Sequence, residues 1–214
     1  MTATPSQDPA DSPLPAPARP GDPRLRRAIA RLDEANAQDP TREEANGQPR
    51  PAALLYAERM SGRLAQFAPE ASEAVQLAVR AQHLERWKTA RTTFPEGRKG
   101  YHEWRTALAR FHAERAGEIL RDVGYDEAFI ARVQSMLRKE RLKLDPDVQT
   151  LEDVACLVFL EFYFSGFGAK HDDEKVIDIL RKTWRKMSPR GQQAALALPL
   201  TSAALALVER AIGK

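Results

Sequence analysis

From Arg24 onward, almost every segment of the chain carries apolar residues three or four positions apart, and none alternates apolar with polar residues over a strand's length. This spacing is typical of amphipathic helices that pack around a common core. It predicts an all-α fold, a single helical bundle of about eight or nine helices. The expected helices cover roughly residues 24–37, 51–67, 69–87, 101–123, 126–140 and 150–164, a stretch ending near 187, a short one from 188, and a last one ending near 212. Residues 39–51, with three prolines and a glycine, are expected to form a linker or long loop.

The first 23 residues differ in composition from the rest of the chain. They hold seven of its 15 prolines and few large apolar residues. Such a segment cannot recover the entropy cost of becoming ordered, so residues 1–23 are expected to form a disordered tail. Residues 24–214 suffice for one ordinary hydrophobic core, which predicts a single all-α domain.

Cysteine content and hydropathy predict where the protein is found. Cys156 is the single cysteine, so an internal disulfide is excluded and a reducing compartment is expected. The apolar run Val154–Leu160 is far shorter than the roughly 20 residues that cross a bilayer. The N-terminus lacks the basic head and apolar core of a secretory signal. These observations predict a cytoplasmic protein without a membrane span.

Positive charge is concentrated in two stretches, although the formal net charge is only +3. Residues 80–115 contain nine Lys or Arg against four acids, and residues 170–190 contain seven against four. Both stretches include tryptophan. One interpretation is that these are solvated helix faces. The other is that they form a site for an anionic partner.

The second interpretation gives a set of candidate substrate-binding residues around a Pro- and Gly-containing loop at 88–100. Arginine's planar fork suits bidentate contacts with phosphate, and aromatic rings can stack on a base. The expected partner is a phosphorylated small molecule or nucleotide, with RNA as an alternative. The candidates are Arg80, Arg86, Trp87, Arg91, Arg98, Lys99, Tyr101, Trp104, Arg105 and Lys182.

A second set of residues has the chemistry of a metal site in a helical bundle. His83, His112 and Asp153 fall on three different expected helices, and imidazoles with a carboxylate are common ligands of divalent metals. Glu114 and Glu152 are the candidate catalytic carboxylates. Each ligand also has a structural interpretation: the histidines as packed helix residues, and Asp153 as part of a capping box with Thr150.

The expected helix at 150–164 is apolar on all sides apart from Glu152, Asp153 and Glu161, which predicts that it is the central, buried helix of the bundle. Glu161 lies deep in this apolar helix. A carboxylate in such a place needs a partner, and an arginine is expected to supply one.

Several segments between Pro51 and Ser188 form a distinctive set. They are PAALLYAERM, QLAVRAQHLERW, FPEGRKGYHEWR, the pair Lys139-Glu140, DVQTLEDVACLVFLEFY and EKVIDILRKTWRKMS. Together they resemble a known family of bacterial and fungal proteins, domain of unknown function 4202. The resemblance implies no established activity.

The segment AERAGEILRDVGYDEAFIARVQSMLRKE, followed by LEDVACL, carries a second, more distant resemblance. These segments are similar to the later half of the fold of the HD-domain phosphohydrolases. The resemblance implies an HD-like bundle and a divalent metal (Mn, Zn, Fe or Mg) that activates water against a phosphoester. The chain departs from the pattern, because His112 is followed by Ala113 instead of aspartate. The His171-Asp172 pair lies in an expected turn, where Asp172 or Asp173 is expected to cap a helix.

The leading hypothesis from sequence is therefore a metal-dependent phosphohydrolase with a degenerate HD-type site, acting on a nucleotide or phosphorylated small molecule. The first alternative is a non-catalytic helical module that binds RNA or a phosphorylated ligand. The second is a helical protein-interaction domain. Whether the protein is an enzyme at all is left open at this stage.

Overall fold

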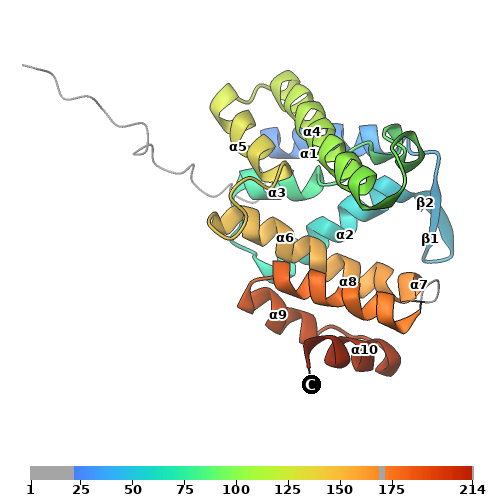
Figure 1. Cartoon of the computed structure of the whole chain (residues 1–214). Coiled ribbons are helices and arrows are strands. Elements are labelled where there is room, and N and C mark those ends of the chain that lie inside the picture. The colour runs from blue at the N-terminus through green and yellow to red at the C-terminus, as the bar shows by residue number, and fades with distance from the viewer. Residues whose placement is uncertain (1–21, 169–171, 214) are drawn as a thin grey trace, which may run out of the picture.

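The computed structural model describes residues 22–168 and 172–213, and the fold is all-α as predicted. Most of the predicted tail, residues 1–21, lies outside the described residues. Figure 1 shows the elements in order. They are α1 (Pro23–Asn36), β1 (Arg42–Ala45), β2 (Gln48–Pro51), α2 (Ala52–Phe67), α3 (Glu73–Arg80), the 3-10 turns η2 (Arg86–Lys88) and η3 (Arg91–Thr93), α4 (Gly97–Val123), α5 (Glu127–Leu137), α6 (Pro146–Val158), the π-helical turn η4 (Phe159–Tyr163), α7 (Phe164–Gly168), α8 (Asp173–Lys186), α9 (Pro189–Leu196) and α10 (Ser202–Ile212).

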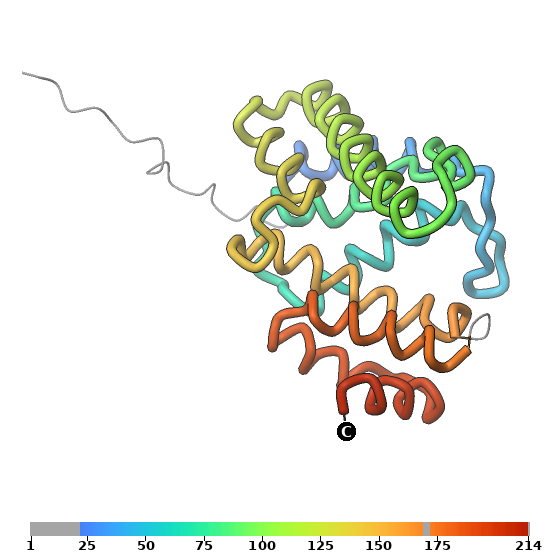
Figure 2. The backbone as a smooth tube through the Cα atoms, viewed as in Figure 1, coloured from blue at the N-terminus to red at the C-terminus, as the bar shows by residue number. Residues whose placement is uncertain are grey.

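Helix α6 is the central helix, as its apolar sequence predicts. It packs against α2, α3, α5, α8 and α9, and Leu151, Val154 and Leu157 are fully buried. Figures 1 and 2 show α1, α3, α4 and α5 on one side of α6, and α8 followed by α9 and α10 on the other. One hydrophobic cluster takes side chains from α1 through α10. No helix in the described part of the chain is long and apolar enough to cross a membrane.

Several predicted helix ends are confirmed by their caps. Gly124 closes α4 in the left-handed conformation with φ of 96°. The side chains of Asp126, Asp172 and Ser188 each accept a backbone N–H in the first turn of α5, α8 and α9. The partner predicted for Glu161 is also present, since its carboxylate pairs with Arg63 of α2.

The segment predicted as a loop at 39–51 contains a short antiparallel hairpin instead. Asn46 and Gly47 both have positive φ, of 53° and 72°, which is the backbone of a tight two-residue hairpin turn. The Asn-Gly pair is the signal that could have predicted it. Alternation could not, because each strand has only four residues and little of it is buried.

The predicted third helix, 69–87, is wrong at both ends. It begins only at Glu73, because Ser72 caps it and Pro69 lies in the preceding turn. It ends at Arg80, and residues 81–85 form a turn in which Glu85 has a φ of 49°. The turn is held by the buried side chain of Asn36, whose oxygen accepts the backbone N–H of Glu85. This tertiary contact replaces the helical hydrogen bond that the spacing predicted.

Two other helices begin earlier than predicted. Helix α4 starts at Gly97 instead of 101, and α6 starts at Pro146 instead of 150. Asp145 caps α6, and its carboxylate accepts from the backbone of Asp147 and Val148. The predicted capping box of Thr150 and Asp153 is therefore wrong, because Thr150 lies inside the helix and its hydroxyl donates to the carbonyl of Pro146.

Candidate functional site

A cavity of about 300 Å³ lies between the turn that follows α3, one face of α4 and the chain just after α5. Five of the described residues that line it are Arg or Lys, and none is Asp or Glu. We call it the basic pocket. Its lining residues are Gln82, His83, Arg86, His102, Arg105, Thr106, Leu108, Ala109, Arg110, His112, Leu137, Arg138 and Lys139.

Two of the predicted histidines lie side by side in this pocket. The turn after α3 supplies His83 and the middle of α4 supplies His112, with ring centroids 6.1 Å apart. The ring of Tyr56, from α2, stacks on His83 at 4.0 Å. The turn at 81–85 is what brings His83 here, because it turns the chain away from the axis of α3.

Both histidines are held in the neutral form. Burial is the main reason that the pKa of His83 falls well below its ordinary value, and the charge of Arg86 lowers it further. Burial likewise lowers the pKa of His112 to about 4. At neutral pH each ring therefore has one N–H and one nitrogen lone pair.

The hydrogen bonds assign these nitrogens. Nδ1 of His112 lies 2.7 Å from the carbonyl oxygen of Leu84, so Nδ1 carries the proton and donates it. Nε2 of His112 is then an acceptor, and it is buried without a partner among the described residues. The amide oxygen of Gln82, on the same pocket, is also buried without a partner there. In His83, Nε2 accepts from Nη1 of Arg86 at 3.3 Å.

Arg86 and Arg105 supply the main positive charge of the pocket. Arg86 is half-buried over the ring of Trp104, 4.7 Å from its centroid. Burial lowers the pKa of Arg86, and the nearby like charge of Arg105 lowers it further. Within residues 22–168 and 172–213, neither is paired with a carboxylate.

Two of the other three cations at the pocket have carboxylate partners, and the third, Arg110, is exposed. Arg138 bonds to the carboxylate of Glu140, and Lys139 bonds to Glu152, which is buried on α6. Burial opposes the charge of Glu152, but Lys139 outweighs it and lowers the pKa of that carboxyl. Glu152 thus reaches the pocket only through Lys139, and its charge is already balanced.

Several predicted substrate-binding residues lie away from the pocket lining. Arg80 is buried in an ion pair with Asp33, and Lys182 pairs with Asp178 on the exposed face of α8. Arg91 donates to the carbonyl of Phe94. Trp87 is half-buried in η2, and Trp104 donates to the carbonyl of Thr89. The other predicted residues outside the lining are exposed at the start of α4: Arg98, Lys99 and Tyr101. Only Arg86 and Arg105 of the predicted set line the pocket.

Of the three predicted metal ligands, the structure brings only His83 and His112 together. The carboxylate of Asp153 accepts from the backbone and hydroxyl of Ser188, 2.8 and 2.5 Å away, and so anchors the start of α9. Glu114 is exposed on α4. Among the described residues, no group of three His, Cys, Asp or Glu side chains could hold a metal ion. The residues present therefore do not fit the divalent metal that the HD resemblance implies.

Sequence reasoning missed Gln82, His102, Arg110, Arg138 and Lys139 as pocket residues. Arg110 could have been predicted, because helical spacing places it on the same face of α4 as residues 102, 105, 106, 109 and 112. Positions 138 and 139 carry no comparable signal. They reach the pocket because the chain leaves α5 through a turn in which Lys139 has a φ of 57°.

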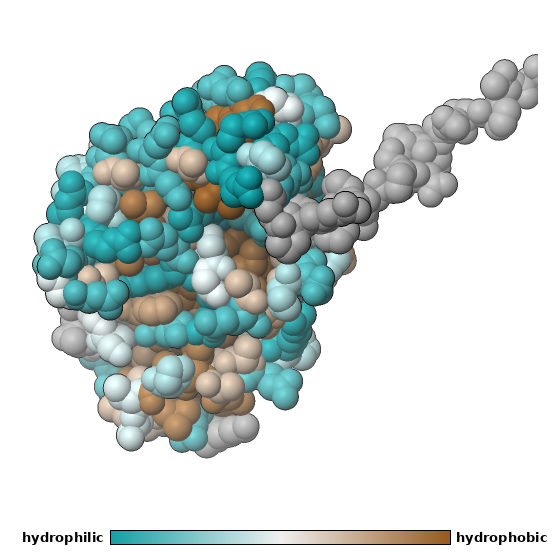
Figure 3. Space-filling view, turned by 180° about the vertical axis from the view of Figure 1, so that it is seen from behind, coloured by the Kyte–Doolittle hydropathy of each residue, from teal (hydrophilic) through white to brown (hydrophobic). Residues whose placement is uncertain are grey.

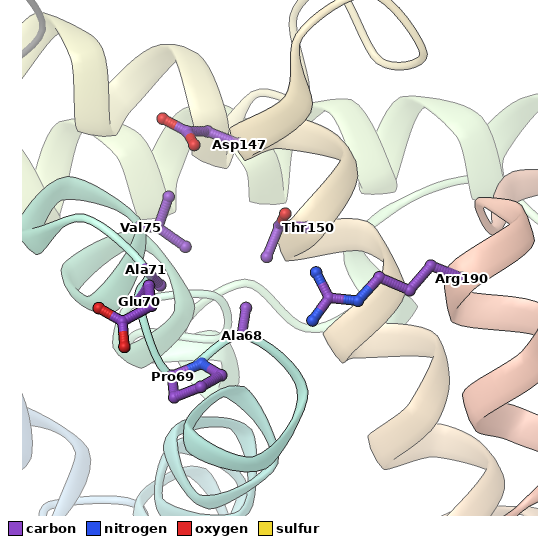
Figure 4. Close-up of a pocket in the computed structure, with 8 residues that line it drawn as sticks. All are labelled: Ala68, Pro69, Glu70, Ala71, Val75, Asp147, Thr150 and Arg190. Atoms are coloured by element: carbon purple, nitrogen blue, oxygen red, sulfur yellow. The ribbon is translucent and has the colours of Figure 1, made fainter.

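A second hollow, of about 360 Å³, lies between the loop after α2, α6 and α9 (Figure 4). It differs from the basic pocket because Glu70 and Asp147 line it together with Arg190. The guanidinium of Arg190 donates to the carbonyl of Phe67 and covers that ring at 4.6 Å. Its charges are mixed and its arginine is engaged, so the basic pocket is the stronger candidate for an anion.

Comparison with known proteins finds one family. The family described as "Domain of unknown function (DUF4202)" matches residues 26–208, which cover nearly all of the helical fold. Neither the curated proteins nor the solved structures give a match.

Proposed function

The chain belongs to the DUF4202 family, and we propose that it binds a small phosphorylated molecule in the basic pocket, with Arg86 and Arg105 holding the phosphate group. The observation that supports this is the pair of neighbouring arginines that lack a carboxylate partner among the described residues. Partly buried cations without a counter-ion cost stability. A bound phosphate would remove that cost and could accept bidentate hydrogen bonds from either fork.

Binding is better supported than the metal-dependent hydrolysis expected from sequence. Hydrolysis of that type needs a metal to generate a nucleophilic hydroxide, and the third expected ligand, Asp153, is engaged by Ser188. A small ligand also suits the site better than RNA. Several arginines of the basic stretch 80–115 are engaged within the protein, among them Arg80 with Asp33 and Arg115 with Glu85.

Replacing Arg105 with glutamine is expected to weaken phosphate binding roughly tenfold or more, because a charge-assisted hydrogen bond contributes about 1.5–3 kcal/mol. Arg86→Gln should have a similar effect. The dissociation constants of inorganic phosphate and ribose 5-phosphate can be measured by isothermal titration calorimetry. The unliganded Arg105→Gln protein should be at least as stable as wild type, because the repulsion on Arg86 is removed.

The matched control is Lys182→Gln, which removes the same charge from an exposed lysine of α8 that pairs with Asp178. It should bind both probes as wild type does. The proposal fails if wild type binds neither probe saturably, or if Arg105→Gln binds them as tightly as Lys182→Gln does.

A further inference from the structure

We propose, resting on the phosphate site described above, that the ligand is a phosphorylated sugar whose hydroxyl donates a hydrogen bond to Nε2 of His112. The sugar can be free or part of a nucleotide, since both present a hydroxylated ring next to a phosphate. Besides the arginine pair, the pocket has two hydrogen-bond acceptors without a donor among the described residues.

The acceptor on His112 is defined by its geometry. A backbone carbonyl can only accept, so the 2.7 Å contact with Leu84 requires the proton on Nδ1 and leaves a lone pair on Nε2. His112 is only 4% exposed, and Nε2 has no donor among the described residues. Buried polar atoms of this kind are rare in folded proteins, and each one needs an explanation.

Gln82 repeats the pattern on the adjoining part of the pocket. It is 7% exposed, and its amide oxygen is buried without a donor in the described part of the chain. Gln82 and His112 both line the basic pocket, beside Arg86 and Arg105. The pocket therefore combines positive charge that no lining carboxylate balances with two acceptors that lack a hydrogen-bond donor.

These two features restrict the chemistry of the ligand. A fully ionised phosphate has only acceptors, so it can satisfy the arginines but not the lone pair of His112. An ammonium group could donate, but it would enter a cavity lined by five Lys or Arg and no described acid. A hydroxyl donates without carrying charge. A phosphate joined to a hydroxylated carbon skeleton meets both requirements, and a sugar phosphate is such a molecule.

The test compares two ligands that differ only in hydroxyl groups. Ribose 5-phosphate and tetrahydrofurfuryl phosphate share the ring and the phosphate, but the second has none of the ring hydroxyls. We expect wild type to bind ribose 5-phosphate roughly tenfold more tightly, as measured by calorimetry, because a buried acceptor is satisfied by only one of the two. Adenosine 5′-monophosphate, run beside them, distinguishes the sources: tighter binding than ribose 5-phosphate assigns a nucleotide, and weaker binding assigns a free sugar phosphate.

Two variants of His112 distinguish the roles of Nδ1 and Nε2. His112→Asn keeps a donor near the position of Nδ1 for Leu84 and removes the acceptor, so the preference for ribose 5-phosphate should disappear. His112→Gln places an amide near the position of Nε2, so part of the preference should remain. Gln82→Met, which leaves the bond between His112 and Leu84 intact, should reduce the preference and serves if the His112 variants fail to fold.

Equal binding of the two ligands by wild type would overturn the inference, and so would an unchanged preference in His112→Asn. Either result would mean that a water molecule satisfies Nε2. These outcomes leave the proposed function intact provided that Arg105→Gln still weakens binding of inorganic phosphate. Absence of phosphate binding in wild type would instead refute the proposed function itself.

Discussion

Replacing Arg80 with alanine is expected to lower the free energy of unfolding by about 3–5 kcal/mol, the range for breaking a buried ion pair by removing one partner. Its Nε and Nη2 bond to the two carboxylate oxygens of Asp33, at 2.7 and 2.6 Å. Its Nη1 donates to the carbonyl of Ala57 and to Ser61, at 3.3 and 3.2 Å. One guanidinium therefore joins α1, α2 and α3, and its loss leaves several polar groups without a partner.

Urea unfolding followed by circular dichroism measures this change. Arg98→Ala, at an exposed position in the first turn of α4, removes the same side chain and should change the free energy by less than about 0.5 kcal/mol. A loss below about 1 kcal/mol in Arg80→Ala would contradict the structural role. If Arg80 instead bound the substrate, the variant would fold as stably as wild type and lose only its ligand.

The contrast between Arg80 and Arg86 shows where sequence reasoning about the site stops. Both lie in the same basic stretch, six residues apart, and both are arginines near aromatic residues. Their roles differ because the carboxylate of Asp33 in α1 pairs with Arg80, whereas no described carboxylate pairs with Arg86. Sequence spacing can place an arginine on a helix face, but the partner comes from an element about 50 residues away. Charge pairing across elements is therefore the part of the site that could not be predicted.

The presence of each helix was easier to predict from the sequence than the residues at which it begins and ends. The spacing of apolar residues predicted α6 as the buried helix, since its burial follows from its own composition. The end of α3 was not predicted, because Asn36 stops the helix by binding the backbone of Glu85. That single contact has a large consequence for the site, as the turn it stabilises carries Gln82 and His83 into the pocket. Positions 138 and 139 depend in the same way on left-handed backbone at Lys139, Arg141 and Lys143, where no glycine marks the turn.

The surface opposite the view of Figure 1 is hydrophilic over much of its area. Figure 3 shows that hydrophobic residues gather toward the end that holds α9 and α10 in Figure 1.

Acidification from pH 6.5 toward pH 4 is expected to destabilise the protein, with His112 alone contributing up to about 3 kcal/mol. In the unfolded chain His112 binds a proton below its ordinary pKa of 6.5, whereas burial lowers the pKa in the folded chain to about 4. Between these values the unfolded state holds more protons, so each pH unit removes about 1.4 kcal/mol of stability. The pKa of His83 is lowered in the same direction, which adds to the effect.

The neighbours of these rings explain why the folded state resists protonation. Arg86 and Arg105 lie near both histidines, and Lys139 lies near His83 from the chain after α5. Tyr56, stacked on His83 from α2, stays neutral because burial raises the pKa of its hydroxyl. Lys139 is itself paired with the carboxylate of Glu152 on α6. No group among these would favour an imidazolium ion.

Urea unfolding at pH 7, 6 and 5 in wild type and in His112→Asn measures the contribution of His112. Carboxyl groups titrate alike in both proteins, so the difference between the two pH profiles belongs to the imidazole. The variant should lose less stability on acidification than wild type, by about 1 kcal/mol per pH unit below 6. Parallel profiles would show that His112 is protonated in the folded protein. Nε2 would then be a donor, and the extra positive charge would make the pocket bind phosphate more strongly in acid. A protonated His112 could not accept a hydrogen bond from a ligand hydroxyl, so this result would contradict the proposed role of Nε2.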